Sequence, residues 1–233
     1  MKLLRYVATV VVMLIASPVL ACTCSFGTPE MGEGKPHAFG LRREQQSGSA
    51  GSVTNSSPSE WSVGDPGSPV VLEVFNDYQC PPCGFFNVEL KRIQVKYAGR
   101  VRVVYRNYPI TNTHVNAMRA AQVAEAAGRQ GKFFEMIDLL YQKRVSWAGS
   151  KNADKLFVSY ARELKLNLKK FRADLKSEAV QQRIDRDVER ARLLKVDGTP
   201  TIVINGELIP LERMQKLDSE IEAKLNAAKS ASP

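Results

Sequence analysis

The chain has little of what a metal-binding or nucleic-acid-binding protein needs. Its 233 residues carry a formal net charge of +9 but include only two histidines and four cysteines. Zinc sites built on a CxxC motif normally use a second such pair, and Cys22 and Cys24 form a poor one. The basic residues between Lys165 and Lys195 alternate with acidic ones and lack interleaved aromatics, which is typical of a solvated helix face. We therefore expect no metal site and no nucleic-acid partner.

Long apolar runs are also scarce. The stretch from Tyr6 to Ile15 is short for a membrane span, and no second run of about 20 apolar residues follows it. Lys2 and Arg5 precede the stretch, and Val19-Leu20-Ala21 offers a cleavage site of small residues. Residues 1–21 are therefore predicted to be a secretory signal peptide. The mature protein would be exported into an oxidising compartment, where disulfide chemistry persists.

The end of this leader allows two outcomes. Val19-Leu20-Ala21-Cys22 resembles a bacterial lipoprotein cleavage box, in which Cys22 would carry a lipid and tether the protein to a membrane. Valine is less usual than leucine at the first position of that box. The alternative is ordinary cleavage after Ala21, which leaves Cys22 and Cys24 as surface thiols. The sequence does not decide between the two.

Residues 22–67 are predicted to be a flexible linker. From residue 25 they are rich in glycine, serine, proline and charged residues and have almost no apolar periodicity, so they cannot build a core. A flexible coil of about 45 residues has a reach of about 35–40 Å, which would let a tethered domain sample the space above a membrane. His37 lies in this segment and is expected to be inert.

The folded domain is expected over residues 68–230. Its strands are indicated by runs of β-branched and aromatic residues, and its helices by apolar residues three and four apart. The patterns predict, in chain order, a strand over 70–75, a helix over 81–97, a strand over 101–105, helices over most of 114–195, a hairpin over 201–209 turning at Asn205-Gly206, and one last helix over 211–225.

Cys80-Pro81-Pro82-Cys83 is the feature that indicates chemistry. Two thiols at this spacing lie on one helical turn and can close a small, reducible disulfide. Cys80 would lie at the helix N-terminus, where unpaired backbone N–H groups and the helix dipole stabilise a thiolate. A buried strand, a short loop and a helix around the motif favour a redox site over a zinc site or a purely structural disulfide. No cofactor beyond the Cys80–Cys83 disulfide is expected.

The chain resembles the DsbA-like branch of the thioredoxin superfamily over about residues 64–228. The resemblance rests on FNDYQCPPC at 75–83, QGKFFEM at 130–136 and VDGTPT at 196–201. It implies an α/β, thioredoxin-like fold, in which a central mixed β-sheet has flanking helices. It also implies a helical insertion subdomain at about 110–195.

The resemblance also implies roles for four residues. Cys80 would be the exposed reactive thiol and Cys83 the buried resolving thiol, while Thr199-Pro200, with a cis-proline, would be the backbone ledge that pairs with a substrate strand. Two features depart from the family pattern: Val74 stands where an acid often lies six residues before the first cysteine, and Pro82 where strongly oxidising members often have histidine. The group that accepts the proton of Cys83 is therefore left open.

Two polar residues are predicted to take no part in the chemistry. Glu73 neighbours Val74 but, by strand alternation, should point to the other face of the sheet. His114 opens the first helix of the insertion and lies far from the cysteines in sequence, so a capping or packing role is expected for it.

We predict an exported thiol-disulfide oxidoreductase of the bacterial periplasm or cell envelope, and above all a dithiol oxidase that introduces disulfides into unfolded or newly exported cysteine-containing proteins. The resemblance implies that a membrane quinone-coupled protein reoxidises it. One alternative is a disulfide reductase or isomerase, although isomerases usually carry an N-terminal dimerisation domain that residues 25–67 cannot make. The other is a non-enzymatic, thiol-based metal-binding module with slow thiol exchange. The motifs do not set the direction of electron flow.

Overall fold

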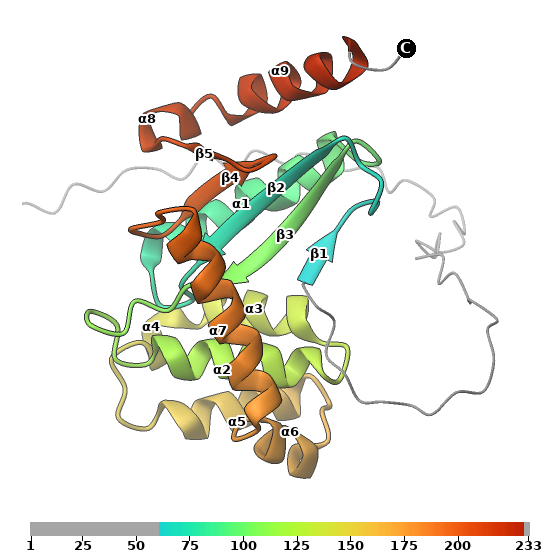
Figure 1. The fold of residues 1–233 in the computed structure, drawn as a ribbon. Helices are drawn as coiled ribbons and strands as arrows, with labels where there is room; N and C mark the ends of the chain where they lie inside the picture. Colours follow the sequence, from blue (N-terminus) through green and yellow to red (C-terminus); the bar gives the residue numbers. More distant parts are fainter. Residues whose placement is uncertain (1–60, 231–233) are drawn as a thin grey trace, which may run out of the picture. The chain divides into compact units, whose positions relative to one another are not determined.

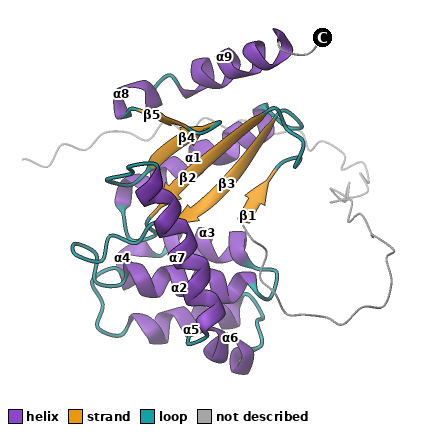
Figure 2. Ribbon diagram, viewed as in Figure 1, coloured by secondary structure: helices purple, strands orange, loops and turns teal. Residues whose placement is uncertain are grey.

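The computed structural model describes residues 61–230 (Figures 1 and 2). The predicted signal peptide, Cys22, Cys24, His37 and the linker up to residue 60 lie outside the described residues. A mixed sheet of five strands lies at the centre, in the order β1-β3-β2-β4-β5. The strands are β1 Trp61–Val63, β2 Val70–Asn76, β3 Val101–Asn107, β4 Thr201–Ile204 and β5 Glu207–Ile209.

The register of β2 positions the candidate site. β2 runs parallel to β3 and antiparallel to β4, and it is buried along nearly its whole length, which suits its mostly apolar sequence. Phe75 near its end pairs with Thr201 at the start of β4. The loop that follows β2 and the loop that precedes β4 therefore lie at the same end of the strands.

Helices flank the sheet and form a bundle beside it (Figure 1). The bundle contains α2 to α6, and α7 runs from it back along the sheet, as the predicted helical insertion requires. The helices are α1 Pro81–Lys96, α2 Ala117–Gly128, α3 Phe133–Gln142, α4 Arg144–Trp147, α5 Ala153–Glu163, α6 Leu168–Asp174, α7 Glu178–Leu193, α8 Leu211–Met214 and α9 Leu217–Ser230. Within residues 61–230, no helix is both long and apolar enough to cross a membrane.

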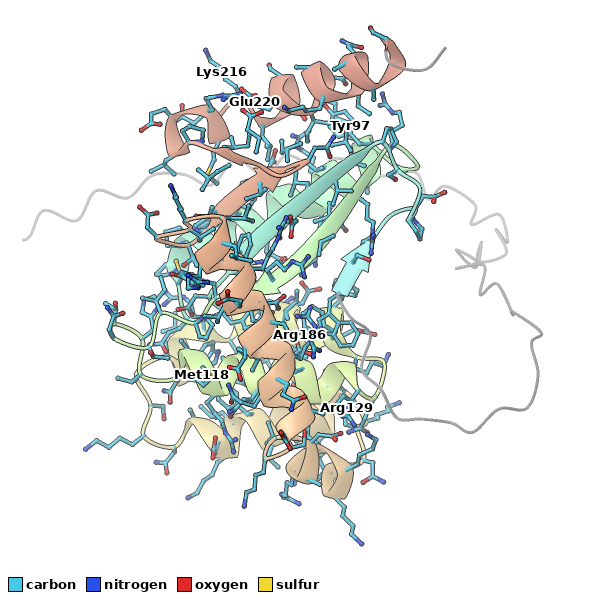
Figure 3. The ribbon with its side chains drawn as sticks, viewed as in Figure 1. Tyr97, Met118, Arg129, Arg186, Lys216 and Glu220 are labelled. Carbon is cyan, nitrogen blue, oxygen red and sulfur yellow. The ribbon has the colours of Figure 1, made fainter. Side chains whose placement is uncertain are left out.

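Partly buried polar contacts join helices that are distant in sequence. At the end of α2, the guanidinium of Arg129 lies 2.8 Å from the carboxylate of Asp174 at the end of α6. On the other side of the sheet, the hydroxyl of Tyr97 donates a 3.0 Å hydrogen bond to Asp218 of α9. Figure 3 labels Arg129 and Tyr97 at these two places.

A buried network of charged and polar groups joins β3 to α2 and α7. The backbone N–H of Asn107 donates to Asp187 at 2.9 Å, and its side-chain amide donates to Glu125 at 2.7 Å. Asp187 also forms an ion pair with Arg183 at 2.6 Å, and both side chains are fully buried. Burial raises the pKa of Glu125 to about 7. The network joins the helical insertion to the sheet. Breaking any one of its contacts would leave a buried polar or charged group without a partner, which costs free energy.

The predicted linker boundary is wrong at its end, because Trp61–Val63 form the edge strand β1. The ring of Trp61 stacks on that of Phe133, with centroids 4.5 Å apart, and its Nε1 donates to Glu125 at 2.8 Å. These partners lie more than 60 residues away in sequence. Local composition, from which the linker was predicted, holds no information about them.

The prediction of one last helix is also wrong, since the chain forms α8 and α9 with a break at Gln215 and Lys216. The break leaves Leu211 72% exposed while Leu217 is buried. The predicted hairpin is confirmed: β4 and β5 pair antiparallel around Asn205-Gly206, both with positive φ as a type I′ turn requires.

Candidate active site

The CPPC segment begins α1. Cys80 is the N-cap residue in an extended conformation, and the two prolines occupy the first helical positions, where their missing N–H groups would have no helical partner. Cys80 is 6% exposed and Cys83 is fully buried. The prediction that the Cys80 thiol is exposed is therefore wrong, because its sulfur packs 3.4 Å from the carbonyl oxygen of Thr199. Both cysteines are free thiols in this structure.

The two thiols have opposite tendencies to ionise. The pKa of Cys80 is lowered to about 6, first by a hydrogen bond from the Cys83 side chain, and further by Thr199 and by the backbone N–H of Cys83; burial opposes the shift. The pKa of Cys83 is raised, mainly by burial and then by its neighbour Cys80. One thiol therefore ionises near neutral pH while the other keeps its proton.

The loop before β4 brings Thr199 and Pro200, which are joined by a cis peptide bond, close to the sulfur of Cys80. The thiol of Cys80 donates to the carbonyl oxygen of Thr199 over 3.4 Å. The hydroxyl of Thr199 is buried and has no hydrogen-bond partner within the described part of the chain. It is therefore free to donate to the sulfur once Cys80 has ionised. The structure thus brings the four predicted site residues, Cys80, Cys83, Thr199 and Pro200, to one place.

Two hollows flank the CPPC segment. One, of about 320 Å³, lies between Pro82, the loop that holds Thr199 and Pro200, and Leu211. The other, of about 360 Å³, lies along α1, and its lining includes Phe85 and Val145, which are 81% and 87% exposed. Exposed apolar side chains therefore lie on both sides of Cys80.

Sequence reasoning missed a buried acid–base pair beside the thiols. Asp77 precedes Cys80 by three residues, and its fully buried carboxylate lies 2.7 Å from Nδ1 of His114. The carboxylate also accepts hydrogen bonds from the backbone N–H groups of Gln79 and Ile110, at 2.7 and 2.9 Å. His114 was expected only to cap or pack because it is distant in sequence. The signal that could have found it is the parallel pairing of β2 and β3, whose following loops must meet at one edge of the sheet.

Glu73 does not face the thiols, in agreement with the strand alternation. Its carboxylate lies 2.8 Å from Arg106 and 2.7 Å from Arg190. Burial would raise the pKa of Glu73, but the hydrogen bonds and charges of the two arginines lower it overall. The part of the chain that the structure describes contains no group of three or more His, Cys, Asp or Glu side chains that could hold a metal ion.

The match to a family model shows to which protein family this chain belongs. The model of a family described as thioredoxin matches residues 56–223. The chain belongs to this thioredoxin family.

Solved structures of thioredoxin-family proteins show the same architecture. A thioredoxin-like oxidoreductase from Silicibacter pomeroyi is 28% identical, with a TM-score of 0.59 over 75% of this chain and 95% of that one. BdbD from Bacillus subtilis is 21% identical with a TM-score of 0.63, over 72% and 94% of the two chains. Wolbachia pipientis α-DsbA1 is 19% identical with a TM-score of 0.62, over 74% and 94%. The predicted thioredoxin-like fold and the resemblance to DsbA-like proteins are confirmed.

Relatives in the sequence comparison are of two kinds. A Na⁺/H⁺ antiporter, NhaA 3 of Salinispora tropica, is 39% identical over 139 residues, which are 60% of this chain but 20% of that protein. A probable disulfide bond formation protein D of Bacillus anthracis is 28% identical over 152 residues, 63% of this chain and 70% of that one. This thioredoxin-family chain therefore spans about a fifth of the length of the antiporters that it matches.

Proposed function

We propose that this thioredoxin-family protein is a protein thiol-disulfide oxidoreductase, and specifically a dithiol oxidase that gives its Cys80–Cys83 disulfide to exported proteins. The observation that carries the proposal is the opposite shift of the two thiols, with the pKa of Cys80 lowered to about 6 and that of Cys83 raised. A stabilised thiolate favours the reduced form of the pair. The disulfide is then more readily reduced by substrate, which makes it a stronger oxidant.

The proposed reaction passes through a mixed disulfide. A substrate thiolate attacks Sγ of Cys80, a substrate–Cys80 bond forms, and the bond to Cys83 breaks so that Cys83 leaves with the electron pair and takes up a proton. A second substrate thiolate then attacks the substrate sulfur, and Cys80 leaves as a thiolate. The substrate gains a disulfide and loses two electrons, which reside in the two thiols of the enzyme. A leaving thiol with a low pKa speeds the second step.

The surroundings of Cys80 support an unfolded protein as the substrate. The ledge at Thr199 and Pro200 offers backbone groups to an extended segment, and backbone pairing is independent of side-chain identity. The exposed Phe85, Val145 and Leu211 offer apolar contact on either side of the ledge. Such contacts suit a chain whose own apolar residues are not yet buried.

The proposal includes export to the bacterial periplasm or cell envelope and reoxidation by a membrane quinone-coupled protein. Support comes from the leader-like residues 1–21 and from the relative named as a disulfide bond formation protein. Lipidation of Cys22 would anchor the protein to the membrane. Cys22→Ser should then move the protein from the membrane fraction to the soluble one without changing its thiol chemistry, and a mature mass without acyl chains would exclude the anchor.

Redox equilibration with glutathione tests the direction. A reduction potential near or above about −180 mV supports an oxidase, and one below about −250 mV supports a reductase. Slow thiol exchange combined with tight metal binding would instead support the metal-binding alternative. Trapping tests the roles: Cys83→Ser should accumulate mixed disulfides with substrate proteins, whereas Cys80→Ser should form none. Faster alkylation of Cys83 than of Cys80 in the reduced protein would contradict the assignment.

A further inference from the structure

A buried negative charge lies next to the thiol that has to ionise. The side chain of Asp77 is fully buried, and the backbone N–H of Cys80 donates to the Asp77 carbonyl at 3.1 Å, so the two residues share one turn. The Asp77 charge raises the pKa of Cys80, against the groups that lower it. A carboxylate at this place therefore opposes the ionised state on which the proposed function depends.

His114 is the partner of this carboxylate that can change its charge. Its Nδ1 lies 2.7 Å from Oδ2 of Asp77, and its side chain is 21% exposed, so protons can reach the ring from solvent. Histidine is the side chain whose charge can change within the physiological pH range. The other donors to Asp77 are the backbone N–H groups of Gln79 and Ile110, which are neutral at every pH.

Other titratable and charged groups lie on the elements packed around the pair. Cys83 on α1 and Tyr141 on α3 both have raised pKa values, chiefly through burial, and stay neutral. Arg144 on α4 donates to the carbonyl of Gln79 at 3.4 Å and stays positive. On the loop before β4, Asp197 is exposed and lines the hollow beside Pro82. Glu125, whose pKa burial raises to about 7, bonds to Trp61 and Asn107 and not to this pair.

We propose that His114 is a positioning residue that controls, through Asp77, how readily Cys80 ionises. When His114 is protonated, its charge cancels that of Asp77 and the thiolate is stabilised. When His114 is neutral, the carboxylate repels the thiolate and the thiol is favoured. The inference rests on the proposed function only for the use to which the cell puts the coupling. Its test measures the protonation of His114 and the ionisation of Cys80, and not the oxidation of a substrate.

The coupling must act in both directions. If protonated His114 stabilises the thiolate, the thiolate must stabilise protonated His114 by the same free energy. The disulfide form has no thiolate, so the ring should titrate at a higher pH in the reduced protein than in the oxidised one. The chain has one other histidine, His37, so NMR of the wild-type protein gives two ring signals, and His114→Gln identifies which is which.

We expect the ring signals of His114 to change with pH differently in the reduced and oxidised proteins, with the protonated ring persisting to higher pH in the reduced one. The His37 signal, which reports on the same pH and redox change elsewhere in the chain, should titrate alike in both states. An identical pH dependence of the His114 signals in the reduced and oxidised proteins would overturn the proposal. This measurement needs no variant that might fail to fold.

Thiolate absorbance against pH supplies the second readout. Asp77→Asn should lower the pKa of Cys80, because the repelling charge is gone while an amide still accepts hydrogen bonds. His114→Gln should raise it, because the amide can donate to Asp77 but carries no charge, and His114→Lys should restore the low value. His37→Gln is the matched control and should change nothing. A pKa that rises in Asp77→Asn, or is the same in His114→Gln and His114→Lys, would contradict the coupling.

These outcomes separate the inference from the proposed function. A reductase would show a low potential against glutathione and could still show the reciprocal shift of His114. Conversely, an oxidase with a high potential whose His114 titrates alike in both redox states would retain the function and lose the inference.

Discussion

Replacing Cys83 by alanine or by serine separates two roles of this residue. Both changes remove the thiol to which the proposed function gives the resolving role, but serine keeps a hydroxyl that can donate a hydrogen bond to the thiolate of Cys80. The hydrogen bond from Cys83 is the largest cause of the lowered pKa of Cys80. We therefore expect the pKa of Cys80 to stay within about half a unit of wild type in Cys83→Ser and to rise in Cys83→Ala.

The size of the change follows from the hydrogen bond. With a pKa of about 6, Cys80 is about 90% ionised at pH 7. A hydrogen bond to a charged group contributes about 1.5–3 kcal/mol, equivalent to about 1–2 pKa units. Cys83→Ala should therefore have a Cys80 pKa of about 7–8, and the ionised fraction at pH 7 should fall to between about a half and a tenth.

The change in the pKa of Cys80 is measured from the rate of alkylation by iodoacetamide at several pH values. Nucleophilicity rises with pKa, with a Brønsted slope of about 0.4–0.5, so at pH 7 the smaller ionised fraction and the stronger nucleophile nearly cancel. At pH 5 the two effects do not cancel, because the ionised fraction falls further than the nucleophilicity rises. Cys83→Ala should then react about 3- to 10-fold more slowly than Cys83→Ser. Identical pH midpoints in the two variants, or a lower midpoint in Cys83→Ala, would refute the assignment of the Cys83 hydrogen bond.

Three further predictions follow from other contacts. Thr199→Val removes the buried hydroxyl that can reach the thiolate, and thiolate absorbance should show the pKa of Cys80 raised by up to about one unit. Gly128→Ala places a methyl group in the space of the Trp61 ring and should lower the free energy of unfolding in urea by about 1–3 kcal/mol. Glu125 has its pKa raised by burial to about 7 from 4.5, so its protonated form favours folding; that stability is present below about pH 4.5 and is lost as pH rises through about 7. From pH 5 to pH 8, wild type should lose on the order of 1–3 kcal/mol relative to Glu125→Gln.

Each of these has a control in the same chain. Thr201→Val also removes a threonine hydroxyl near the site, one that donates to the Gly198 carbonyl, and should leave the pKa of Cys80 unchanged. Gly149→Ala adds a methyl group where nothing lies within 4 Å and should leave stability unchanged. If Glu125→Gln follows the pH dependence of wild type, the carboxyl is ionised in the folded protein near pH 5, and the role given to burial is wrong.

The reactive residues could be predicted from the sequence more fully than the residues around them. The two cysteines and Thr199-Pro200 each lie in a short contiguous motif. Such a motif can be recognised from neighbouring residues alone, so the amino-acid sequence is enough to name them. The partnership of Asp77 with His114 could not be predicted, because it depends on which strands pair and on where their loops emerge. Trp61 was missed for the same reason: a single tryptophan after a glycine- and serine-rich stretch shows no periodicity, and its partners Phe133 and Glu125 lie on two helices of the insertion.

The sheet ends on both sides in a strand of only three residues, β1 and β5. Longer strands at an edge offer unpaired backbone groups to any extended chain and so promote aggregation. A protein that handles unfolded chains would meet such partners continually. Under the proposed function, short edges would direct a foreign strand to the backbone at Thr199, where its capture would lead to a resolvable disulfide and not to a growing aggregate.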